Sequence, residues 1–292
     1  MKQENWLTQY GTSLQGKIVA ITGATGGLGS EICRGILFLG GSLLLLTRSK
    51  EKTDVLIREL LNEFPGASID FFPLDLQNPE SVKKACRFLE QNPPDILLHN
   101  AGIYDVPRQI CSTGLDNIFQ VNFASPYCLT KQLLPALRQK HAHIVVVGSI
   151  AHTYSASDPN DMDFSARKAC HLAYGNSKRY LMYAFSQLLK EETQVSFSIG
   201  HPGISLTNIS NHYPAWLFPL IRPFLKFFFM KPETACRSIL YAVCHEIPYS
   251  SWVGPRFLDL WGNPRIRPLR TVSSSERRQM FFSAEDMYNR LR

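Results

Sequence analysis

Short apolar runs alternate with helix-length segments along most of the chain, and this alternation is the feature that most constrains the fold. The runs are apolar at consecutive positions rather than at every second position, as in Lys-Ile-Val-Ala-Ile-Thr at 17–22. A strand of this kind is buried on both faces. Strands separated by helices predict right-handed βαβ crossovers, and therefore a doubly wound parallel α/β sheet flanked by helices. We expect strands at 17–22, 42–47, 68–74, 95–98, 143–148 and 195–199, and helices at 27–40, 52–64, 79–90, 114–140, 172–192 and 231–246.

The length of 292 residues permits either two average domains or one large α/β domain. Apolar residues make up 45% of the chain and charged residues 19%, which excludes disorder and low complexity. No internal repeat occurs, and no long linker precedes about residue 265. We therefore expect a single domain over 1–292, with its core at 17–268 and a basic tail at 269–292.

The positive charge is concentrated near the C-terminus. The formal net charge is +7, and the segment from Arg256 to Arg292, with eight arginines and four acids, carries +4 of it. Such a tail could bind phosphates, an anionic membrane or, as a minor alternative, nucleic acid. The competing interpretation is a solvated, weakly folded terminus.

The cysteines and the N-terminal segment bear on the compartment. Seven cysteines occur, an odd number, and no two form a Cys-x-x-Cys pair. This pattern argues against a disulfide scaffold or a zinc knuckle, so we expect a reducing compartment and no metal site. The first 17 residues lack the apolar segment of a secretory signal, and no apolar run reaches the roughly 18 residues of a membrane span. We expect an intracellular protein, either cytoplasmic or peripherally membrane-associated.

A glycine-rich turn joins the first expected strand to the first expected helix. Its sequence, Thr-Gly-Ala-Thr-Gly-Gly-Leu-Gly, covers positions 22–29. Backbone N–H groups at a helix start can hold a pyrophosphate, and glycines let the backbone approach it. The strand–turn–helix context favours a dinucleotide site over a tight turn without a ligand. The candidate residues are Gly23, Thr25, Gly27, Leu28 and Gly29.

The spacing Thr-Gly-x-x-x-Gly-x-Gly resembles the short-chain dehydrogenase/reductase family, which has a Rossmann-type fold. The resemblance covers roughly Lys17 to Pro268 and implies further contacts with a dinucleotide. Asp75 and Leu76 follow the third strand, where the family contacts adenine. The turn Asn100-Ala101-Gly102 follows the fourth strand. The family usually has another Asn before this turn, where this chain has His99.

The end of the second strand bears on which dinucleotide is bound. An NAD site usually has an acidic residue there to accept from the ribose hydroxyls, whereas a 2′-phosphate needs cations. The chain reads Leu-Thr-Arg-Ser-Lys at 46–50, with no acid at the strand end. Because Arg48 can stack on adenine and pair with phosphate, we expect NADP(H), with NAD(H) as the weaker alternative.

A tyrosine and a lysine lie four residues apart at the start of a long helix. Tyr174 and Lys178 therefore share one helical face. A free phenol has a pKa of roughly 10 and is a poor base at neutral pH. A nearby ammonium group favours the phenolate, so we expect Lys178 to lower the pKa of Tyr174 and suit it to acid–base chemistry.

The resemblance implies a catalytic tetrad of Asn122, Ser149, Tyr174 and Lys178. Tyr174 would exchange the proton with the substrate oxygen, and Ser149, at the end of the fifth strand, would hydrogen-bond that oxygen. Lys178 would also bind the nicotinamide ribose, and Tyr174 would lie against the cofactor. Asn122 would hold a water that relays protons to Lys178.

The segment after the sixth strand has a Pro-Gly pair followed by a threonine. By resemblance, Pro202 and Gly203 shape a turn at the cofactor, and Thr207 contacts the nicotinamide amide. His201 is expected to be structural. An aromatic-rich lid is expected at 215–230. Three interpretations of that segment stay open: a cover over an apolar substrate pocket, a contact with a membrane interface, and a surface packed on the core or in a dimer.

The gap between Ser149 and Tyr174 suggests a branch of the family. It spans 25 residues, about twice the usual length, and includes Asp158, Asp161 and Asp163. This insert resembles the retinol dehydrogenase-like branch. The resemblance implies an NADP(H)-dependent oxidoreductase that interconverts a carbonyl and an alcohol on a retinoid-, steroid- or lipid-like substrate. The alternatives are a non-catalytic NADP(H)-binding regulator or scaffold and an epimerase or lyase on the same fold. Family members often dimerise through the helix that carries the tyrosine, so a homodimer is a further expectation.

Overall fold

The computed structural model describes residues 3–203, 230–269 and 272–292. The strands of this part form one sheet in the order β3-β2-β1-β4-β5-β6-β7-β8. Neighbours are parallel as far as β7, and β8 is antiparallel to β7. The strands are β1 Ile18–Thr22, β2 Ser42–Thr47, β3 Ile69–Pro73, β4 Ile96–His99, β5 His143–Val147, β6 Ser196–Gly200, β7 Ser251–Phe257 and β8 Trp261–Pro268.

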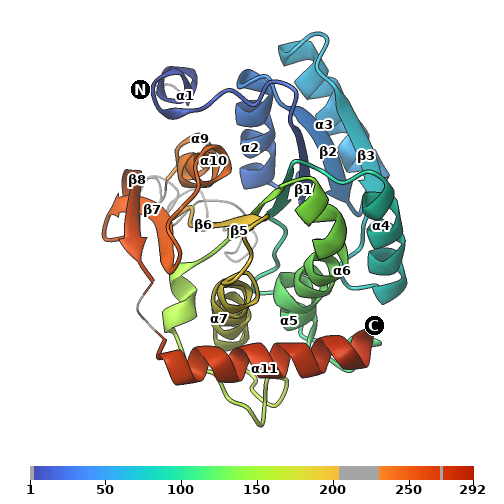
Figure 1. The fold of residues 1–292 in the computed structure, drawn as a ribbon, viewed down its shortest axis with the longest axis vertical. Helices are drawn as coiled ribbons and strands as arrows, with labels where there is room; N and C mark the ends of the chain where they lie inside the picture. Colours follow the sequence, from blue (N-terminus) through green and yellow to red (C-terminus); the bar gives the residue numbers. More distant parts are fainter. Residues whose placement is uncertain (1–2, 204–229, 270–271) are drawn as a thin grey trace, which may run out of the picture.

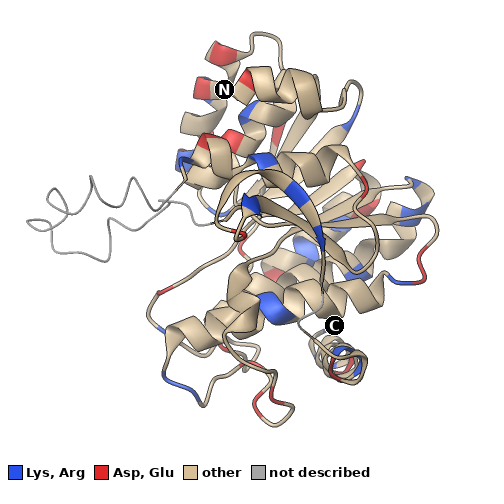
Figure 2. Ribbon diagram, turned by 90° about the vertical axis from the view of Figure 1, so that its left-hand side faces the viewer, with Lys and Arg blue, Asp and Glu red and all other residues tan. Residues whose placement is uncertain are grey.

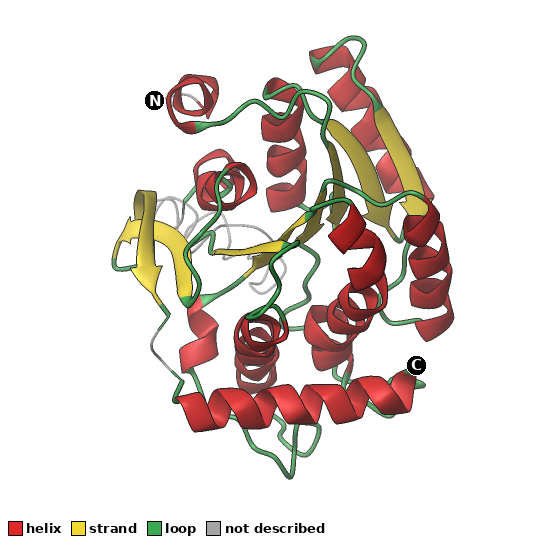
Figure 3. Cartoon of the chain, viewed as in Figure 1, coloured by secondary structure: helices red, strands yellow, loops and turns green. Residues whose placement is uncertain are grey.

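Helices cover both faces of the sheet (Figure 1 and Figure 3). They are α1 Gln3–Tyr10, α2 Gly27–Phe38, α3 Lys50–Glu63, α4 Pro79–Gln91, α5 Asn117–Phe119, α6 Ser125–Gln139, α7 Cys170–Leu188, α9 Pro232–Ala235, α10 Arg237–Cys244 and α11 Ser274–Leu291. A π-helical turn, η1 Gln120–Ala124, precedes α6, and a 3-10 turn, η2 Ile150–Thr153, follows β5. The predicted doubly wound parallel sheet is confirmed.

Successive residues of the central strands point to opposite faces, and each face has its own hydrophobic cluster. In β1, Val19 and Ile21 pack with residues of α2, α3 and α10, whereas Ala20 packs with residues of α4, α6 and α7. The strand is therefore apolar at every position because both of its faces are covered. This double coverage explains the consecutive apolar runs in the sequence.

Some elements differ from the expected boundaries. The helix expected at 114–140 comprises α5, η1 and α6, and the one expected at 231–246 comprises α9 and α10 on either side of Cys236. The strands β7 and β8 were not predicted. Both contain proline, which removes a ladder hydrogen bond. It is tolerated in the edge strand β8 and in β7 beside the register shift between Pro255 and Phe257.

The C-terminal tail forms a packed helix rather than a weakly folded terminus. Ser273 caps α11 by accepting a hydrogen bond from the Glu276 backbone N–H at 3.1 Å. Met280, Ala284 and Met287 are buried on one face of α11 and belong to the same hydrophobic cluster as α6 and α7. Figure 1 shows α11 running across α7, and Figure 2 shows that it carries charges of both signs.

Helix α1 also buries Trp6 and Leu7, so the hydrophobic core extends beyond the expected 17–268 at both ends. The assignment of 1–292 to one domain stays a prediction.

The candidate site residues lie where the parallel strands end. Asn100 follows β4, Ser149 follows β5, and Pro202 follows β6. Arg48 and Asp75 follow β2 and β3. Because these strands are parallel, their carboxyl ends lie at one edge of the sheet, where open α/β folds bind ligands.

Candidate active site

The glycine-rich turn is closely packed, and two of its glycines have no room for a side chain. Gly23 has a φ of 67°, and a Cβ atom there would be 2.7 Å from the Cα of Ala101. A Cβ on Gly29 would be 2.4 Å from the carbonyl oxygen of Gly23. Thr25 and Leu28 are partly exposed, and Gly27 is exposed at the start of α2. The turn thus presents backbone at a helix N-terminus, as the sequence predicts.

Asn100 fastens the turn to the end of β4. Its Nδ2 donates to the carbonyl oxygens of Thr22 and Gly23, each at 3.0 Å. In return, Thr22 Oγ1 accepts from the backbone N–H groups of Asn100 at 3.1 Å and Ala101 at 3.0 Å. Thr22 was not among the predicted site residues. Its signals in the sequence are that it begins the Thr-Gly-x-x-x-Gly-x-Gly motif and is the polar last residue of an apolar strand.

His99, at the position where the family usually has asparagine, does not face the turn. It is buried, and its Nε2 lies 2.7 Å from Thr130 Oγ1 on α6. Burial lowers the pKa of His99 to about 3, so the imidazole is neutral. The substitution therefore leaves the contacts of Asn100 intact.

An arginine projects at the end of β2. Arg48 is exposed and makes no hydrogen bond or ion pair with the rest of the described chain. The nearby Lys50 is paired with Asp54 at 2.7 Å. Arg48 is thus available for an anionic group, whereas Lys50 already has a partner.

The residues after β3 form a turn of their own. Asp75 Oδ1 accepts from the backbone N–H of Gln77 at 3.0 Å. Leu76 is buried, and its carbonyl oxygen accepts from Ser125 Oγ at 2.6 Å. The side chain of Asp75 therefore shapes this turn locally, and its predicted contact with adenine stays a prediction.

Tyr174 and Lys178 lie one turn apart on α7, as their spacing predicts. Lys178 is buried, and its Nζ donates to the carbonyl oxygen of Val147 at 2.8 Å. The same Nζ is 5.8 Å from the centre of the Tyr174 ring. Burial lowers the pKa of Lys178 to about 8.

The pKa of Tyr174 shifts in the direction opposite to the one expected. Burial raises it to about 12, and the polar interaction with the Ser149 side chain lowers it by less than burial raises it. Lys178 does not offset the burial, because its ammonium group is directed to Val147 rather than to the phenol oxygen. Tyr174 is therefore a neutral phenol at physiological pH.

Asn122 lies in the π-helical turn η1 and is completely buried. Its Oδ1 accepts from the Ile103 backbone N–H at 2.8 Å, and its Nδ2 donates to the Ile103 carbonyl and to Ser177 Oγ, each at 3.0 Å. A Cβ on Gly102 would be 3.4 Å from Asn122 Oδ1 and 3.5 Å from Lys178 Nζ. Asn122 Oδ1 and Lys178 Nζ therefore both lie next to Gly102 of the Asn-Ala-Gly turn. Short π-helical turns often occur at functional sites.

Ser149 begins the turn η2, which lies close against α7. Its Oγ accepts from the backbone N–H of Ala151 at 3.2 Å. A Cβ on Gly175 would be 2.5 Å from the carbonyl oxygen of Ala151. A glycine next to Tyr174 thus allows the turn and the helix to approach, which brings Ser149 within range of the phenol.

Two further tyrosines surround Tyr174, and neither was predicted. The Tyr104 ring, in the loop after β4, packs edge-on against the Tyr174 ring with 4.8 Å between centroids. Tyr154, which follows η2, packs against His171 and lies close to the start of α7, where a Cβ on Gly175 would be 3.2 Å from its own Cβ. Both Tyr104 and Tyr154 are 50% exposed. Because they lie in loops without a motif, the sequence contains no signal that brings them together.

The acidic insert between Ser149 and Tyr174 is held by ion pairs and backbone hydrogen bonds. Arg167 pairs with Asp158 at 2.9 Å and with Asp161 at 3.6 Å. Asp163 accepts from the Asp116 backbone N–H at 2.7 Å. Among residues 3–203, 230–269 and 272–292, no three His, Cys, Asp or Glu residues are grouped to hold a metal ion.

The segment after β6 begins with a tight turn. Gly203 has a φ of 78°, and a Cβ there would be 2.5 Å from the side chain of Met230. His201 is buried, stacks on Trp252 with 5.1 Å between centroids, and lies with its Nε2 2.9 Å from the Asp259 carbonyl oxygen. These contacts agree with a structural role. Thr207 and the predicted lid at 215–230, except for Met230, lie outside the described residues.

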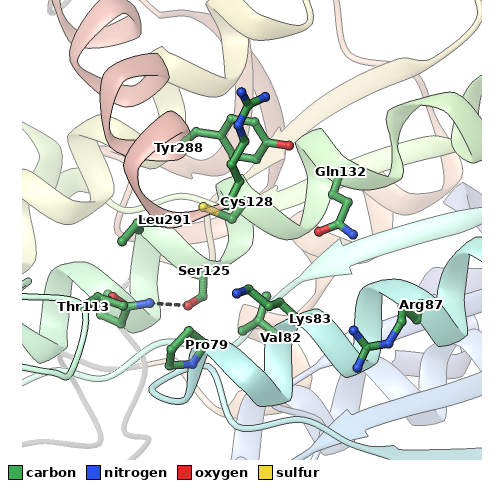
Figure 4. Close-up of a pocket in the computed structure, with 12 residues that line it drawn as sticks. Pro79, Val82, Lys83, Arg87, Thr113, Ser125, Cys128, Gln132, Tyr288 and Leu291 are labelled. Carbon is green, nitrogen blue, oxygen red and sulfur yellow. Dashed lines mark hydrogen bonds between the residues drawn. The ribbon is translucent and has the colours of Figure 1, made fainter.

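A cavity of about 470 Å³ lies between α4, η1, α6 and the end of α11 (Figure 4). None of the predicted catalytic or cofactor residues lines it. Its walls are formed by Pro79, Val82, Lys83, Arg87, Thr113, Gln120, Ser125, Cys128, Gln132, Tyr288, Leu291 and Arg292. It is therefore separate from the candidate active site.

In the part of the chain that the structure describes, no helix combines the length and the apolar character needed to cross a bilayer.

The chain matches a known protein family and several curated proteins. Residues 17–216 match the family model described as short chain dehydrogenase. The chain is 30% identical to dehydrogenase/reductase SDR family member 13 from Bos taurus over 80% of this chain and 64% of that protein. It is 29% identical to retinol dehydrogenase 14 from Mus musculus, over 79% of this chain and 74% of that protein.

A solved structure gives the same fold. The crystal structure of an uncharacterised protein from Mycobacterium Paratuberculosis superposes with a TM-score of 0.77 and 25% identity, covering 96% of both chains. The chain spans only about two thirds of the length of several curated relatives, 64% of one and 65% of another. The family match covers more than half of the chain, so this protein belongs to the short-chain dehydrogenase/reductase family and resembles its retinol dehydrogenases.

Proposed function

We propose that the protein is an NADP(H)-dependent oxidoreductase that interconverts a carbonyl and an alcohol on a lipophilic substrate, with Tyr174 as the acid and base. One observation carries the proposal. Tyr174 lies beside Ser149 and Lys178, at the sheet edge that also holds the glycine-rich turn. Membership of the family supports it, because the same four residue types form the family's tetrad.

The residues of the turn fit a dinucleotide. Gly23 and Gly29 let the turn pack closely, because a side chain at either would clash with neighbouring backbone. The exposed backbone of Gly26 and Gly27 at the start of α2 suits a pyrophosphate. At the end of β2, Arg48 is exposed and has no partner among the described residues, which favours a 2′-phosphate and hence NADP(H) over NAD(H). When bound, the cofactor supplies or accepts a hydride at the nicotinamide ring.

Tyr174, Ser149 and Lys178 would together transfer the proton to or from the substrate oxygen. In the reducing direction, the neutral phenol of Tyr174 donates its proton to the oxygen that gains charge. Ser149 Oγ donates a hydrogen bond to the same oxygen. The phenolate that remains once the proton has left would attract the buried ammonium of Lys178, which donates to the Val147 carbonyl while the phenol is neutral.

Asn122 would hold the loop that carries the Asn-Ala-Gly turn. Both polar atoms of its side chain bond to the backbone of Ile103, and Nδ2 also bonds to Ser177. Because a carbonyl oxygen has two lone pairs, Oδ1 retains room for one more donor. The predicted water between Asn122 and Lys178 therefore remains part of the proposal.

The surroundings of Tyr174 favour an apolar substrate. The half-exposed rings of Tyr104 and Tyr154 form an aromatic rim around the phenol. Resemblance to a retinol dehydrogenase points to the same class of substrate. The lid at 215–230, a membrane contact and a homodimer stay as predictions.

Turnover of purified protein tests the proposal. NADPH and NADH are each mixed with a panel of lipophilic and small polar aldehydes and ketones, and loss of reduced nicotinamide is followed by absorbance. We expect turnover with lipophilic carbonyls and a preference for NADPH. Tight NADPH binding without turnover on any carbonyl or alcohol would instead favour the non-catalytic regulator or scaffold.

A further inference from the structure

The C-terminal helix contacts the segment that follows the turn η2. Glu276, in the first turn of α11, accepts through Oε1 from Arg179 Nε at 2.9 Å and Nη2 at 2.8 Å. The same oxygen accepts from the backbone N–H of Ser157 at 3.2 Å and from its hydroxyl at 2.9 Å. One carboxylate oxygen thus joins α11, α7 and the segment after η2.

Arg179 extends this connection toward the reacting residues. It directly follows Lys178 on α7 and is only 4% exposed. Its Nη1 donates to the carbonyl oxygen of His152 at 2.8 Å. The His152 Nδ1, in turn, donates to the carbonyl oxygen of Ser149 at 2.6 Å. Glu276 is therefore connected to the backbone of Ser149 through two hydrogen-bonded side chains.

We propose that Glu276 is a positioning residue for the reaction: through Arg179 and Ser157 it holds the segment 149–157 so that Ser149 Oγ lies beside the Tyr174 phenol. This inference rests on the proposed function. Glu276 itself touches neither Tyr174 nor Ser149. It acts by fixing the backbone from which Ser149 projects.

The burial of Arg179 makes this link strong. A buried guanidinium without a counter-ion is strongly unfavourable, so Arg179 needs a fixed carboxylate. Burial raises the pKa of Glu276, but the hydrogen bonds from Ser157 and Arg179 outweigh it, and the pKa lies below its usual value. Glu276 is therefore ionised at neutral pH. When its charge is removed, the buried guanidinium of Arg179 loses its counter-ion, and we expect its hydrogen bonds to position 276 to weaken and its hold on the His152 carbonyl to loosen.

The same helix provides a matched control. Glu285 accepts from Tyr127 Oη at 2.6 Å and pairs with Lys131, both on α6. Like Glu276, it fastens α11 to the body of the protein, but no hydrogen bond in the described chain links it to the 149–157 segment. E276Q and E285Q each remove one carboxylate charge from α11. Only E276Q disturbs the connection to Ser149.

The experiment compares full-length E276Q and E285Q with the wild type in NADPH-dependent reduction of a lipophilic aldehyde. We expect E276Q to lower kcat by about 10- to 100-fold, because small displacements of reacting groups are costly. Its Kd for NADPH should stay within about twofold, since the glycine turn is untouched. E285Q should lower Tm yet keep the kcat of the wild type.

The pH dependence separates positioning from a general loss of stability. The titratable groups that face Tyr174 are Lys178, Tyr104 and Tyr154, and none contacts Glu276 directly. Ser149 lowers the pKa of Tyr174, so displacement of Ser149 should move the Tyr174 limb of the kcat/KM profile to higher pH. Amide hydrogen exchange of 149–157 should accelerate in E276Q and not in E285Q.

Each outcome distinguishes a positioning role of Glu276 from a merely stabilising one. The inference would be overturned if a folded E276Q kept the kcat, the pH profile and the amide hydrogen exchange of the wild type. It would also be overturned if E285Q lost as much kcat as E276Q. If E276Q does not fold, R179K takes its place, because a lysine keeps the charge but cannot bond to both Glu276 and His152 in the same geometry. A wild type without any turnover would refute the proposed function, whereas hydrogen exchange would still test the placement of the Ser149 turn.

Discussion

The two halves of the candidate site are held together by different kinds of contact. In the cofactor half, the glycine turn is fixed by backbone groups and by Thr22 and Asn100, whose partners lie in the motifs themselves. In the reacting half, the Ser149 turn depends on Arg179 and Glu276, which are 97 residues apart. The cofactor half can therefore be identified from local spacing, whereas the supports of the reacting half come from the far end of the chain.

Y174F should have the largest effect on this comparison, because it removes the proton donor of the reacting half and leaves the cofactor half intact. We expect kcat to fall by about 1,000-fold, in the range that acid–base groups contribute. NADPH binding, measured by fluorescence titration, should stay within about threefold of the wild type. Turnover near the wild-type rate would mean that another group transfers the proton.

M280A tests whether the C-terminal helix belongs to the core. Met280 is completely buried on α11, and its truncation should lower the free energy of unfolding by about 2–4 kcal/mol. F282A is the control on the same helix, because Phe282 is 60% exposed. Its effect should stay within about 0.5 kcal/mol in denaturant titrations. Equal stabilities of the two variants would mean that α11 contributes little to the core.

R48E addresses the cofactor half alone. Loss of a charge-assisted bond to a 2′-phosphate, with repulsion added, should raise the Kd for NADPH by about 10- to 100-fold. The Kd for NADH should change by less than about threefold, since NADH lacks the phosphate. K50Q is the control, because Lys50 is paired with Asp54 and should leave both affinities near the wild type. Parallel weakening of both cofactors in R48E would remove the argument for NADP(H).

Y154A should have the smallest effect, and it tests whether Tyr154 contacts the substrate in the reacting half. Loss of one half-exposed ring should raise KM for a lipophilic aldehyde by about three- to tenfold and leave kcat for a small aldehyde unchanged. Tyr249, which precedes β7 and is 47% exposed, gives the matched control Y249A. An unchanged KM across the aldehyde panel would exclude Tyr154 from the substrate rim.

The sequence allowed the sheet, its central strands and the relation between Tyr174 and Lys178 to be predicted, because burial patterns and helical spacing are local properties. It did not allow the direction of the Tyr174 pKa shift to be predicted. That direction depends on where the Lys178 ammonium points, and the ammonium donates its hydrogen bond to the Val147 carbonyl oxygen. Burial then dominates and raises the pKa.

The strand β8 was not predicted because it contains prolines, and α11 was not predicted as a packed helix because the tail is rich in charged residues. In both cases the deciding contacts are tertiary. Pro264 and Pro268 are tolerated because β8 pairs on one side only. Met280 and Met287 are covered by the hydrophobic cluster of α6 and α7, and this cluster is not visible in the composition of the tail. Tyr104 and Tyr154 likewise meet Tyr174 only in the folded chain.

Transfer of deuterium tests the central claim most directly. Wild-type protein is incubated with all-trans-retinal, or another lipophilic aldehyde from the panel, and NADPH deuterated at both C4 positions, and the product is analysed by mass spectrometry. The account predicts an alcohol that carries a single deuterium on the former carbonyl carbon, with no such product from Y174F. An alcohol without deuterium, or labelled alcohol formed equally by Y174F, would contradict hydride transfer assisted by Tyr174.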